Sequence, residues 1–256
     1  MLTAIVRTPA SSLIDACELT FIERTTMNMS VLEAQHLAYR RALEQAGAQV
    51  STLEAVSELP DSVFVEDTAV VLDEIAVLTR PGSDSRLAEP AHLEPVLAQH
   101  RQLERIQAPG TLEGGDVLRV NRTLFVGRSV RTNKEGVAQL ERFVQPFGYT
   151  VVPVNVPGSL HLKTACTCLD ASTLLFNPNW VDVAPFRGFK QIPVASGEPF
   201  AANVLPVGSS LLVNAAYPKT LELIRQYSSV SVISVDISEF GKAEAGLTCM
   251  SLIFNL

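Results

Sequence analysis

The chain of 256 residues is 47% hydrophobic and 18% charged, so it can bury a sizeable core and is not an intrinsically disordered protein. Its 20 Lys and Arg residues stand against 27 Asp and Glu residues, and the net charge of −7 disfavours nucleic acid and anionic membranes as partners while permitting a small cationic ligand. Four cysteines are too few for a disulfide framework, and the first residues lack the pattern of a secretory signal, so we expect free thiols and a cytoplasmic location.

The predicted elements begin with a short strand at residues 4–6. A helix is then expected from the capping-box pattern Ser30-Val31-Leu32-Glu33 to Gly47. Hairpins follow, each with a polar start, an apolar run, a tight turn and a second apolar run. Four such hairpins are predicted, over residues 66–78, 113–126, 161–176 and 202–213.

Further helices are predicted between the later hairpins. One starts with a second capping box, Thr132-Asn133-Lys134-Glu135, and runs to Gly148, another follows Pro218, and a further helix is expected around Pro90 and Pro95. The last strand lies within residues 248–254, and its natural partner is the first strand of the chain.

The polar starts recur at a nearly constant spacing of 42 to 48 residues, at Asp67, Glu113, His161, Asn203 and Cys249. A module of this size cannot bury its apolar faces alone, so the modules must pack against one another, and pairing of the last strand with the first closes them into a ring. The sequence therefore predicts an α/β fold of five ββαβ modules in one domain, residues 1–256. Equivalent positions of the modules then face one central point.

Two of the residues at that point are a cysteine and a histidine. A thiol is a nucleophile and an imidazole is a proton shuttle at neutral pH, so Cys249 and His161 together indicate covalent catalysis. Taken singly, a cysteine in an apolar strand is more often a buried hydrophobic residue, and a lone histidine is more often structural. Their equivalent places in the repeat favour the catalytic interpretation.

Carboxylates accompany them. Glu113 precedes two glycines, and Glu66 and Asp67 interrupt an apolar run, where burial without a partner is costly. A guanidinium ligand, planar and cationic, matches paired carboxylates best, and an internal Arg or Lys partner is the alternative. Arg86 and Arg131 follow the second strands of successive modules, as a carboxylate clamp would, although solvated surface arginines are the default. Asp61 is placed to take an ammonium group, so the set fits a free amino acid with a cationic tail.

Several segments resemble one known family: residues 60–67, 79–82, 112–116, 131–133, 160–163 and 248–251. They are similar to the dimethylarginine dimethylaminohydrolases of the guanidino-modifying superfamily, whose five-module α/β propeller is called the pentein fold. The resemblance implies hydrolysis of N-omega-methylated arginine to citrulline and dimethylamine or methylamine through a covalent S-alkylthiouronium, with neither metal nor organic cofactor.

Residue by residue, the resemblance makes Cys249 the nucleophile, His161 the general acid and base, and Glu113 the carboxylate that orients His161. Asp67, supported by Glu66, is expected to bind the guanidinium nitrogens. Arg86 and Arg131 are expected to hold the substrate carboxylate, and Asp61 the amine side. The main-chain oxygens of Leu19 and Ala243 match family substrate contacts by approximate position. The lid expected between Leu19 and Met29 contains no glycine.

Three alternatives stay open. An arginine deiminase uses the same chemistry but releases ammonia, and that family carries an extra helical domain for which the module spacing leaves no room. An amidinotransferase passes the amidino group to an amine acceptor and is also larger. A non-catalytic propeller of the same architecture binds a partner without chemistry. The resemblance also allows a homodimer.

Overall fold

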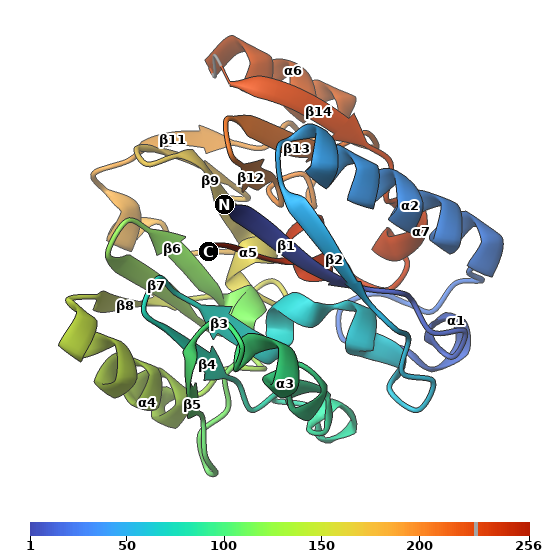
Figure 1. Ribbon diagram of the computed structural model, residues 1–256. Helices are drawn as coiled ribbons and strands as arrows, with labels where there is room; N and C mark the ends of the chain where they lie inside the picture. The colour runs from blue at the N-terminus through green and yellow to red at the C-terminus, as the bar shows by residue number, and fades with distance from the viewer. Residues whose placement is uncertain (228–229) are drawn as a thin grey trace.

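The computed structural model describes residues 1–227 and 230–256, and over these residues it contains five sheets of three strands each. The first sheet joins the two ends of the chain, and the other four follow in chain order (Figure 1). In sheet order the strands are β15 (Leu252–Asn255), β1 (Leu2–Arg7) and β2 (Gln49–Leu53); β3 (Ala69–Val71), β4 (Ile75–Leu78) and β5 (Gln102–Arg105); β6 (Val117–Val120), β7 (Thr123–Arg128) and β8 (Thr150–Asn155); β9 (Cys166–Asp170), β10 (Thr173–Phe176) and β11 (Lys190–Pro193); β12 (Leu205–Val207), β13 (Ser210–Asn214) and β14 (Ser231–Val235).

Each sheet has the same topology. The middle strand pairs antiparallel with its hairpin partner and parallel with the third strand, as β7 does with β6 and β8. A parallel neighbour requires a crossover connection, and the segment between the second and third strands of each module supplies it. The predicted α/β fold of five modules is therefore confirmed, and helices longer than one turn lie in the crossovers of the first, third and fifth modules.

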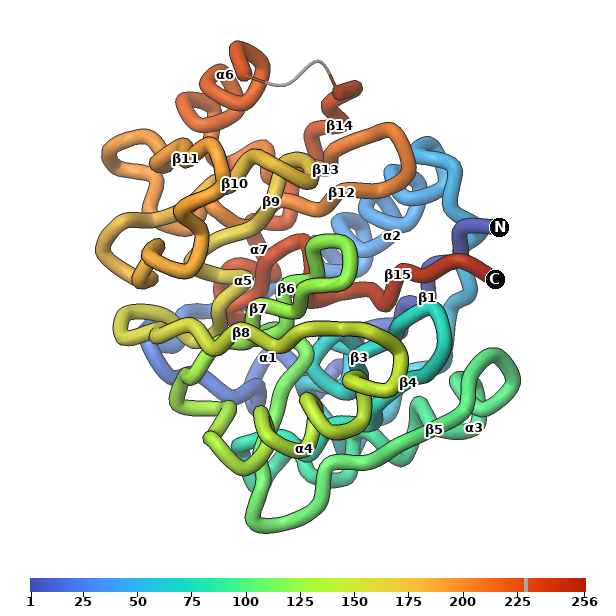
Figure 2. Tube along the Cα trace, turned by 90° about the vertical axis from the view of Figure 1, so that its left-hand side faces the viewer, coloured from blue at the N-terminus to red at the C-terminus, as the bar shows by residue number. Residues whose placement is uncertain are grey.

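The two ends of the chain close the ring. β1 and β15 are antiparallel, with Leu2 opposite Asn255. The amide of Leu256 donates to the carbonyl oxygen of Met1 at 2.9 Å. Both views show the two termini close together, and in Figure 2 they lie at the right-hand edge of the molecule (Figures 1 and 2). The predicted pairing of the last strand with the first is confirmed.

Three of the four helices expected from the sequence are α2 (Met29–Gln45), α4 (Lys134–Val144) and α6 (Pro218–Tyr227). The fourth, around Pro90 and Pro95, consists of two single turns, η4 (Glu89–His92) and α3 (Glu94–Leu97). Both predicted capping boxes are wrong. The N-caps are Asn28 and Asn133, whose side-chain oxygens accept from the amides of Val31 at 3.2 Å and Gly136 at 2.8 Å. An asparagine carbonyl reaches the exposed N–H of the first turn as well as a hydroxyl does.

The helical segments other than α2, α4 and α6 are single turns: α1 (Leu13–Ala16), α3 (Glu94–Leu97), α5 (Leu162–Ala165), α7 (Ser238–Gly241) and the 3-10 turns η1 (Pro60–Val63), η2 (Val65–Thr68), η3 (Asp84–Arg86), η4 (Glu89–His92), η5 (Gly114–Asp116), η6 (Gln145–Phe147), η7 (Ala184–Phe186) and η8 (Thr248–Met250).

The polar starts differ locally from the prediction, which placed them in strands. Asp67 and Cys249 lie inside the 3-10 turns η2 and η8, and Glu113 and His161 are the residues directly before η5 and α5. The first strand of each of these hairpins begins only after that turn. A helical turn leaves its first N–H groups free of main-chain partners, so polar side chains and ligands can bind there.

The core lies between modules. One cluster of buried apolar residues joins the second and third sheets under α4, and equivalent clusters join each other pair of neighbouring sheets. Each module thus buries apolar residues against both of its neighbours. All four cysteines are free. In the described part of the chain, no helix is long and apolar enough to cross a membrane.

Candidate active site

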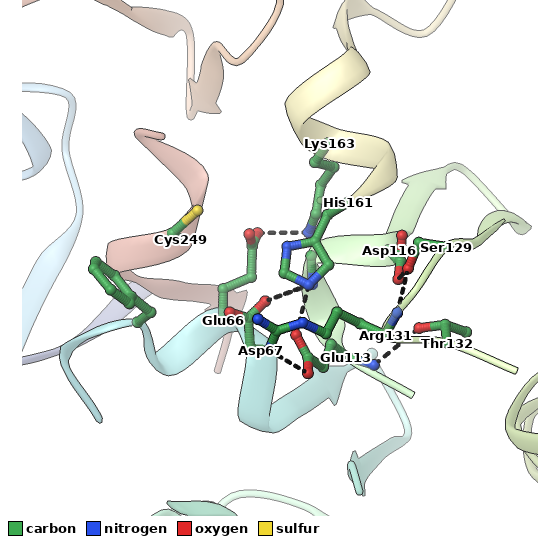
Figure 3. Close-up of polar contacts among 12 residues, drawn as sticks. Glu66, Asp67, Glu113, Asp116, Ser129, Arg131, Thr132, His161, Lys163 and Cys249 are labelled. Atoms are coloured by element: carbon green, nitrogen blue, oxygen red, sulfur yellow. Dashed lines mark hydrogen bonds and ion pairs between the residues drawn. The ribbon is translucent and has the colours of Figure 1, made fainter. Parts of the chain in front are cut away.

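The candidate active site forms where the helical turns before the first strands meet. Glu66 and Asp67 come from η2, Glu113 from the start of η5, His161 from the start of α5 and Cys249 from η8. Figure 3 shows these side chains around one point, with the thiol approaching from a separate turn. The structure therefore brings together residues that are far apart in the sequence.

A buried imidazole and carboxylate form the shortest contact of the predicted catalytic set. Nε2 of His161 lies 2.6 Å from Oε2 of Glu113, whose side chain is fully buried. Burial alone would favour the uncharged form of both groups, but the neighbouring charges outweigh the effect of burial. The carboxylates of Asp67 and Glu113 raise the pKa of His161 to about 9. The hydrogen bond and charge of His161, with the charges of Arg86 and Arg131, lower the pKa of Glu113 to about 2.

Asp67 has an internal cationic partner. Nη1 of Arg86 donates to its Oδ2 at 2.8 Å, and the amide of Gly115 donates to its Oδ1 at 3.0 Å. Arg86 itself is held by Glu89, whose carboxylate accepts from Nε and Nη2. Burial raises the pKa of Glu89 to about 7, against the charge of Arg86. The guanidinium of Arg86 thus lies in a buried ring of acids.

Glu66 also has internal partners. It forms an ion pair with Lys163 and accepts a hydrogen bond from the hydroxyl of Thr248 at 2.7 Å. For Glu66 and Asp67 the structure therefore contains the Lys and Arg partners that the sequence left as an alternative. Asn203, the fourth polar start, supports the same region, because its side chain bonds both the amide and the hydroxyl of Thr248.

The thiol of Cys249 is held beside these carboxylates. Its residue is 8% exposed, and the amide of Gly246 donates to its sulfur at 3.3 Å. Burial raises the pKa of Cys249 to about 12, the charges of Glu66 and Asp67 add to the effect, and the Gly246 hydrogen bond and Lys163 oppose it. The thiol needs a further positive charge beside it to ionise near neutral pH.

A pocket opens beside the thiol. Seven of the ten predicted site residues line it: Asp61, Asp67, Arg86, Arg131, His161, Ala243 and Cys249. Glu113 lies behind His161, and Glu66 faces away toward Lys163. Leu19 packs its side chain against the core, next to Glu18, which does line the pocket. The pocket volume is only about 20 Å³.

Two residues predicted to bind the substrate, Arg131 and Asp61, contact other residues of the protein instead. Arg131 donates to Oε1 of Glu113 at 3.4 Å and to the hydroxyl of Thr20 at 3.1 Å. Asp61 accepts from the amide of Glu18 at 3.0 Å, and burial raises its pKa. Both side chains are buried at the pocket wall.

A larger cavity of about 310 Å³ lies on the other side of the Glu66–Lys163 pair. Its walls come from the first strands of the five sheets and are mostly apolar. It contains neither His161 nor Cys249. The smaller pocket is therefore the candidate active site, since it holds the predicted nucleophile and the predicted proton shuttle.

The two glycines after Glu113 are required by close approach. A side chain at Gly114 would place its Cβ 1.9 Å from the main-chain oxygen of Glu66, and one at Gly115 would lie 2.7 Å from both Oδ1 of Asp67 and Nδ1 of His161. Only hydrogen fits between these groups. The glycine pair thus lets Glu113 and Asp67 reach the same histidine.

Sequence reasoning missed several residues of this site. Glu18, Phe64 and Glu244 line the pocket, and Glu89 holds Arg86. The spacing of three residues between Arg86 and Glu89 is a weak signal that was available. Glu244 has no such signal, because its contacts are with residues more than 220 positions away.

Asp67, Glu113 and His161 also form a group of potential metal ligands, with ligand atoms within 4.8 Å of one another. The sequence predicts a metal-free site. Arg86 and Arg131 already bring positive charge to these carboxylates, and they compete with a cation for the same oxygens.

Comparison with known proteins first defines the class. The family model for arginine deiminase matches residues 8–195, more than half of the chain. With the five-module fold and the buried Cys, His and carboxylates, this match indicates the class of enzymes that modify guanidino groups.

The nearer relatives define the family within that class. The chain is 36% identical to N(G),N(G)-dimethylarginine dimethylaminohydrolase of Pseudomonas aeruginosa over 98% of both chains, and 40% identical to the Streptomyces coelicolor enzyme of the same name over 97% of this chain and 95% of that one. A structure of the Pseudomonas aeruginosa enzyme, a cysteine-to-serine mutant complexed with citrulline, matches with a TM-score of 0.94, 36% identity and 98% coverage of both chains. The chain belongs to the dimethylarginine dimethylaminohydrolase family.

Proposed function

We propose that the protein hydrolyses the guanidino C–N bond of N-omega-methylated arginine to give citrulline and dimethylamine or methylamine. One observation carries the proposal: Cys249 and His161 line a single pocket whose walls also contain Asp67, Arg86, Arg131 and Asp61. A nucleophile, a proton shuttle and charges of both signs are what a zwitterionic amino acid with a guanidinium group requires. The citrulline complex of the Pseudomonas aeruginosa relative supports the product.

The proposed reaction starts with binding of the guanidinium against the thiol. The cation offsets the negative charge of Glu66 and Asp67 and lowers the pKa of Cys249, so the thiol loses its proton to solvent. The sulfur then attacks the guanidinium carbon and forms a tetrahedral adduct. His161, a cation at neutral pH because its pKa is about 9, donates a proton to the departing amine.

The second half of the reaction regenerates the enzyme. Departure of the amine leaves an S-alkylthiouronium on Cys249 and neutral His161. His161 takes a proton from water as the water oxygen attacks the same carbon and forms a second tetrahedral adduct. The C–S bond then breaks as the proton of the new hydroxyl group passes to the sulfur, which releases citrulline and the thiol. Glu113 holds the imidazole in place through both steps, because its oxygen lies 2.6 Å from Nε2.

The remaining roles follow from charge and position. Arg86 and Arg131 hold the substrate carboxylate, Asp61 the amine side, and the main-chain oxygens of Leu19 and Ala243 complete the amino-acid site. Asp67, supported by Glu66, binds the guanidinium nitrogens of the substrate. Arg86 must then share Oδ2 of Asp67 with the substrate or give up its hydrogen bond to that oxygen. Residues 1–256 are proposed to act as one catalytic domain, since the core clusters join successive modules.

The test is to identify the amine released from each candidate substrate. Purified protein is incubated with arginine, monomethylarginine and asymmetric dimethylarginine, and citrulline, ammonia, methylamine and dimethylamine are measured by mass spectrometry. Methylamines with citrulline are expected, and Cys249→Ser is expected to form neither while it remains folded. Ammonia from arginine as the main product would indicate an arginine deiminase, the class whose family model the chain matches. Undiminished turnover by Cys249→Ser would contradict the assigned nucleophile.

A further inference from the structure

Residues 18–28, here called the lid, lie between α1 and α2 and contact the wall of the active-site pocket at Arg131 and Glu244. Glu18 lines the pocket, and Arg24, Thr25 and Thr26 are exposed. The lid has no strand or helix of its own. Its position therefore depends on bonds that its main chain makes to other parts of the molecule.

Glu244 supplies the central pair of these bonds. Its two carboxylate oxygens accept from the amides of Thr20 at 2.5 Å and Phe21 at 2.9 Å. The residue is 9% exposed, and its φ of 56° lies in the left-handed region, which is unfavourable for a residue with a side chain. Thr20 is also held from the opposite side by Arg131, whose Nη2 donates to its hydroxyl.

Glu244 belongs to the same loop that carries the thiol. Ala243 and Ala245 beside it line the pocket, and the amide of Gly246, two residues further on, donates to the sulfur of Cys249. One side chain thus joins the lid to the segment that positions the nucleophile. Because Glu244 bonds to the lid and belongs to this loop, we expect movement of the lid away from Glu244 to displace the loop as well.

The lid must move for a ligand to enter. A pocket of about 20 Å³ is far smaller than an amino acid, and the thiol at its base is 8% exposed. Opening breaks two charge-assisted hydrogen bonds to a buried carboxylate, which are stronger than bonds between neutral groups. Lid opening and closing on this scale commonly limits turnover in enzymes.

We propose that Glu244 is a positioning residue that latches the lid to the Cys249 loop, so that lid closure and placement of the thiol occur together in the hydrolysis proposed above. The residue acts through Thr20, Phe21 and Gly246. The proposal rests on the proposed function for its effect on turnover but not for the latch itself, which is a property of the protein without substrate.

The chain offers a matched control in Glu239. Its carboxylate accepts from the amide of Asn28, at the other end of the lid, and forms an ion pair with Lys242. It is 6% exposed, similar to Glu244, but it does not line the pocket. Loss of this bond therefore disturbs the lid away from the thiol.

The experiment compares the wild type with Glu244→Gln, Glu244→Asp and Glu239→Gln. Gln has nearly the size of Glu, but its side-chain NH₂ group faces one of the two lid amides and cannot accept a hydrogen bond from it. Asp keeps the negative charge, but its shorter side chain cannot reach both amides. Four quantities are measured: the rate of alkylation of Cys249 by iodoacetamide, located by mass spectrometry, the rate of tryptic cleavage after Arg24, kcat and KM. Circular dichroism tests whether each variant is folded. If Glu244→Gln is not folded, the comparison rests on Glu244→Asp.

We expect Glu244→Gln to increase both the alkylation rate and the Arg24 cleavage rate about tenfold, and to raise KM by about the same factor, since the closed form is less populated. Glu239→Gln is expected to leave alkylation of Cys249 within about twofold of wild type. Equal alkylation rates in Glu244→Gln and wild type, or an equal increase in Glu239→Gln, would overturn the latch. Alkylation and cleavage need no substrate, so they decide the latch even if the wild type forms no citrulline.

Discussion

In the free enzyme, burial keeps the thiol of Cys249 protonated and the carboxylates beside it add to this effect, whereas the carboxylates keep the imidazole of His161 protonated against its burial. The same Asp67 that raises the pKa of His161 also raises that of Cys249, because negative charge favours the protonated form of both groups. Near neutral pH the free enzyme therefore holds a thiol and an imidazolium. In the proposed reaction, the proton needed for amine departure is therefore already on His161, and the bound guanidinium supplies the positive charge that stabilises the thiolate.

Replacing Glu113 tests this account at the residue scale. In Glu113→Gln the imidazolium loses its charged hydrogen-bond partner, so the pKa of His161 should fall from about 9 by at least one unit. Turnover near neutral pH should fall by on the order of 10²-fold, because the acid is less well oriented and less protonated. NMR titration of the histidine side chains measures the first effect and citrulline formation the second.

His36 serves as the internal reference in that titration. Burial lowers its pKa to about 4, and it lies in α2, outside the site. Its titration should not change in Glu113→Gln. An unchanged His161 titration together with an unchanged rate would show that Glu113 does not control the imidazole.

At the scale of elements, short turns position the chemistry and longer helices stabilise the modules. The first turns η2, η5, α5 and η8 carry the site residues, and α4 covers the sheet of β6, β7 and β8. The cap of α4 is central to its module, because the side chain of Asn133 accepts from the amides of Gly136 at 2.8 Å and Thr111 at 2.9 Å. The same side chain donates to the carbonyl oxygen of Pro109 at 2.8 Å.

Removal of this cap should destabilise the protein. Asn133→Ala loses all three hydrogen bonds, and we expect the free energy of unfolding to fall by about 1 to 2 kcal/mol. Asn133→Asp keeps an acceptor for both amides and loses only the donor to Pro109, so a smaller loss is expected. Denaturant unfolding of both variants measures the difference. Equal stability of Asn133→Ala and the wild type would mean that water replaces the side chain without cost.

At the scale of the whole molecule, the ring is closed by the first and last strands. Leu252 and Phe254 of β15 and Ile5 of β1 share a buried cluster with residues of the second module. The N-terminal amine donates to the carbonyl oxygen of Leu256 at 3.2 Å. The chain ends thus lie within the reach of a short linker. The cytoplasmic location and the homodimer stay predictions from the sequence.

A circular permutant tests the closure of the ring. The ends are joined by a short Gly/Ser linker, and the chain is opened in the exposed turn between Gly208 and Ser209. Because β1 and β15 keep their register, the permutant should unfold in one cooperative transition and retain citrulline formation within about threefold. Deletion of residues 252–256 is the contrasting variant, and it should lose cooperative unfolding. A permutant without cooperative unfolding would show that closure needs separate termini.

The sequence by itself determined the number and order of modules, because the period of 42 to 48 residues and the alternation of apolar runs are local patterns. It also singled out Cys249, His161 and Glu113, since equivalent positions in a ring must converge. It could not place the true N-caps Asn28 and Asn133, because a hydroxyl and an amide compete for the same N–H groups within a few residues.

Only the tertiary structure decided which charges meet. Arg86 was expected to wait for a ligand carboxylate, yet its guanidinium lies against Asp67 and Glu89. No sequence pattern distinguishes Glu244 from a surface acid, but its carboxylate accepts hydrogen bonds from lid amides more than 220 residues away. A side-chain contact depends on distances of a few ångströms between distant segments, and no periodic pattern records them. The modules are therefore encoded locally, whereas the partners of each buried charge are set by how the modules pack.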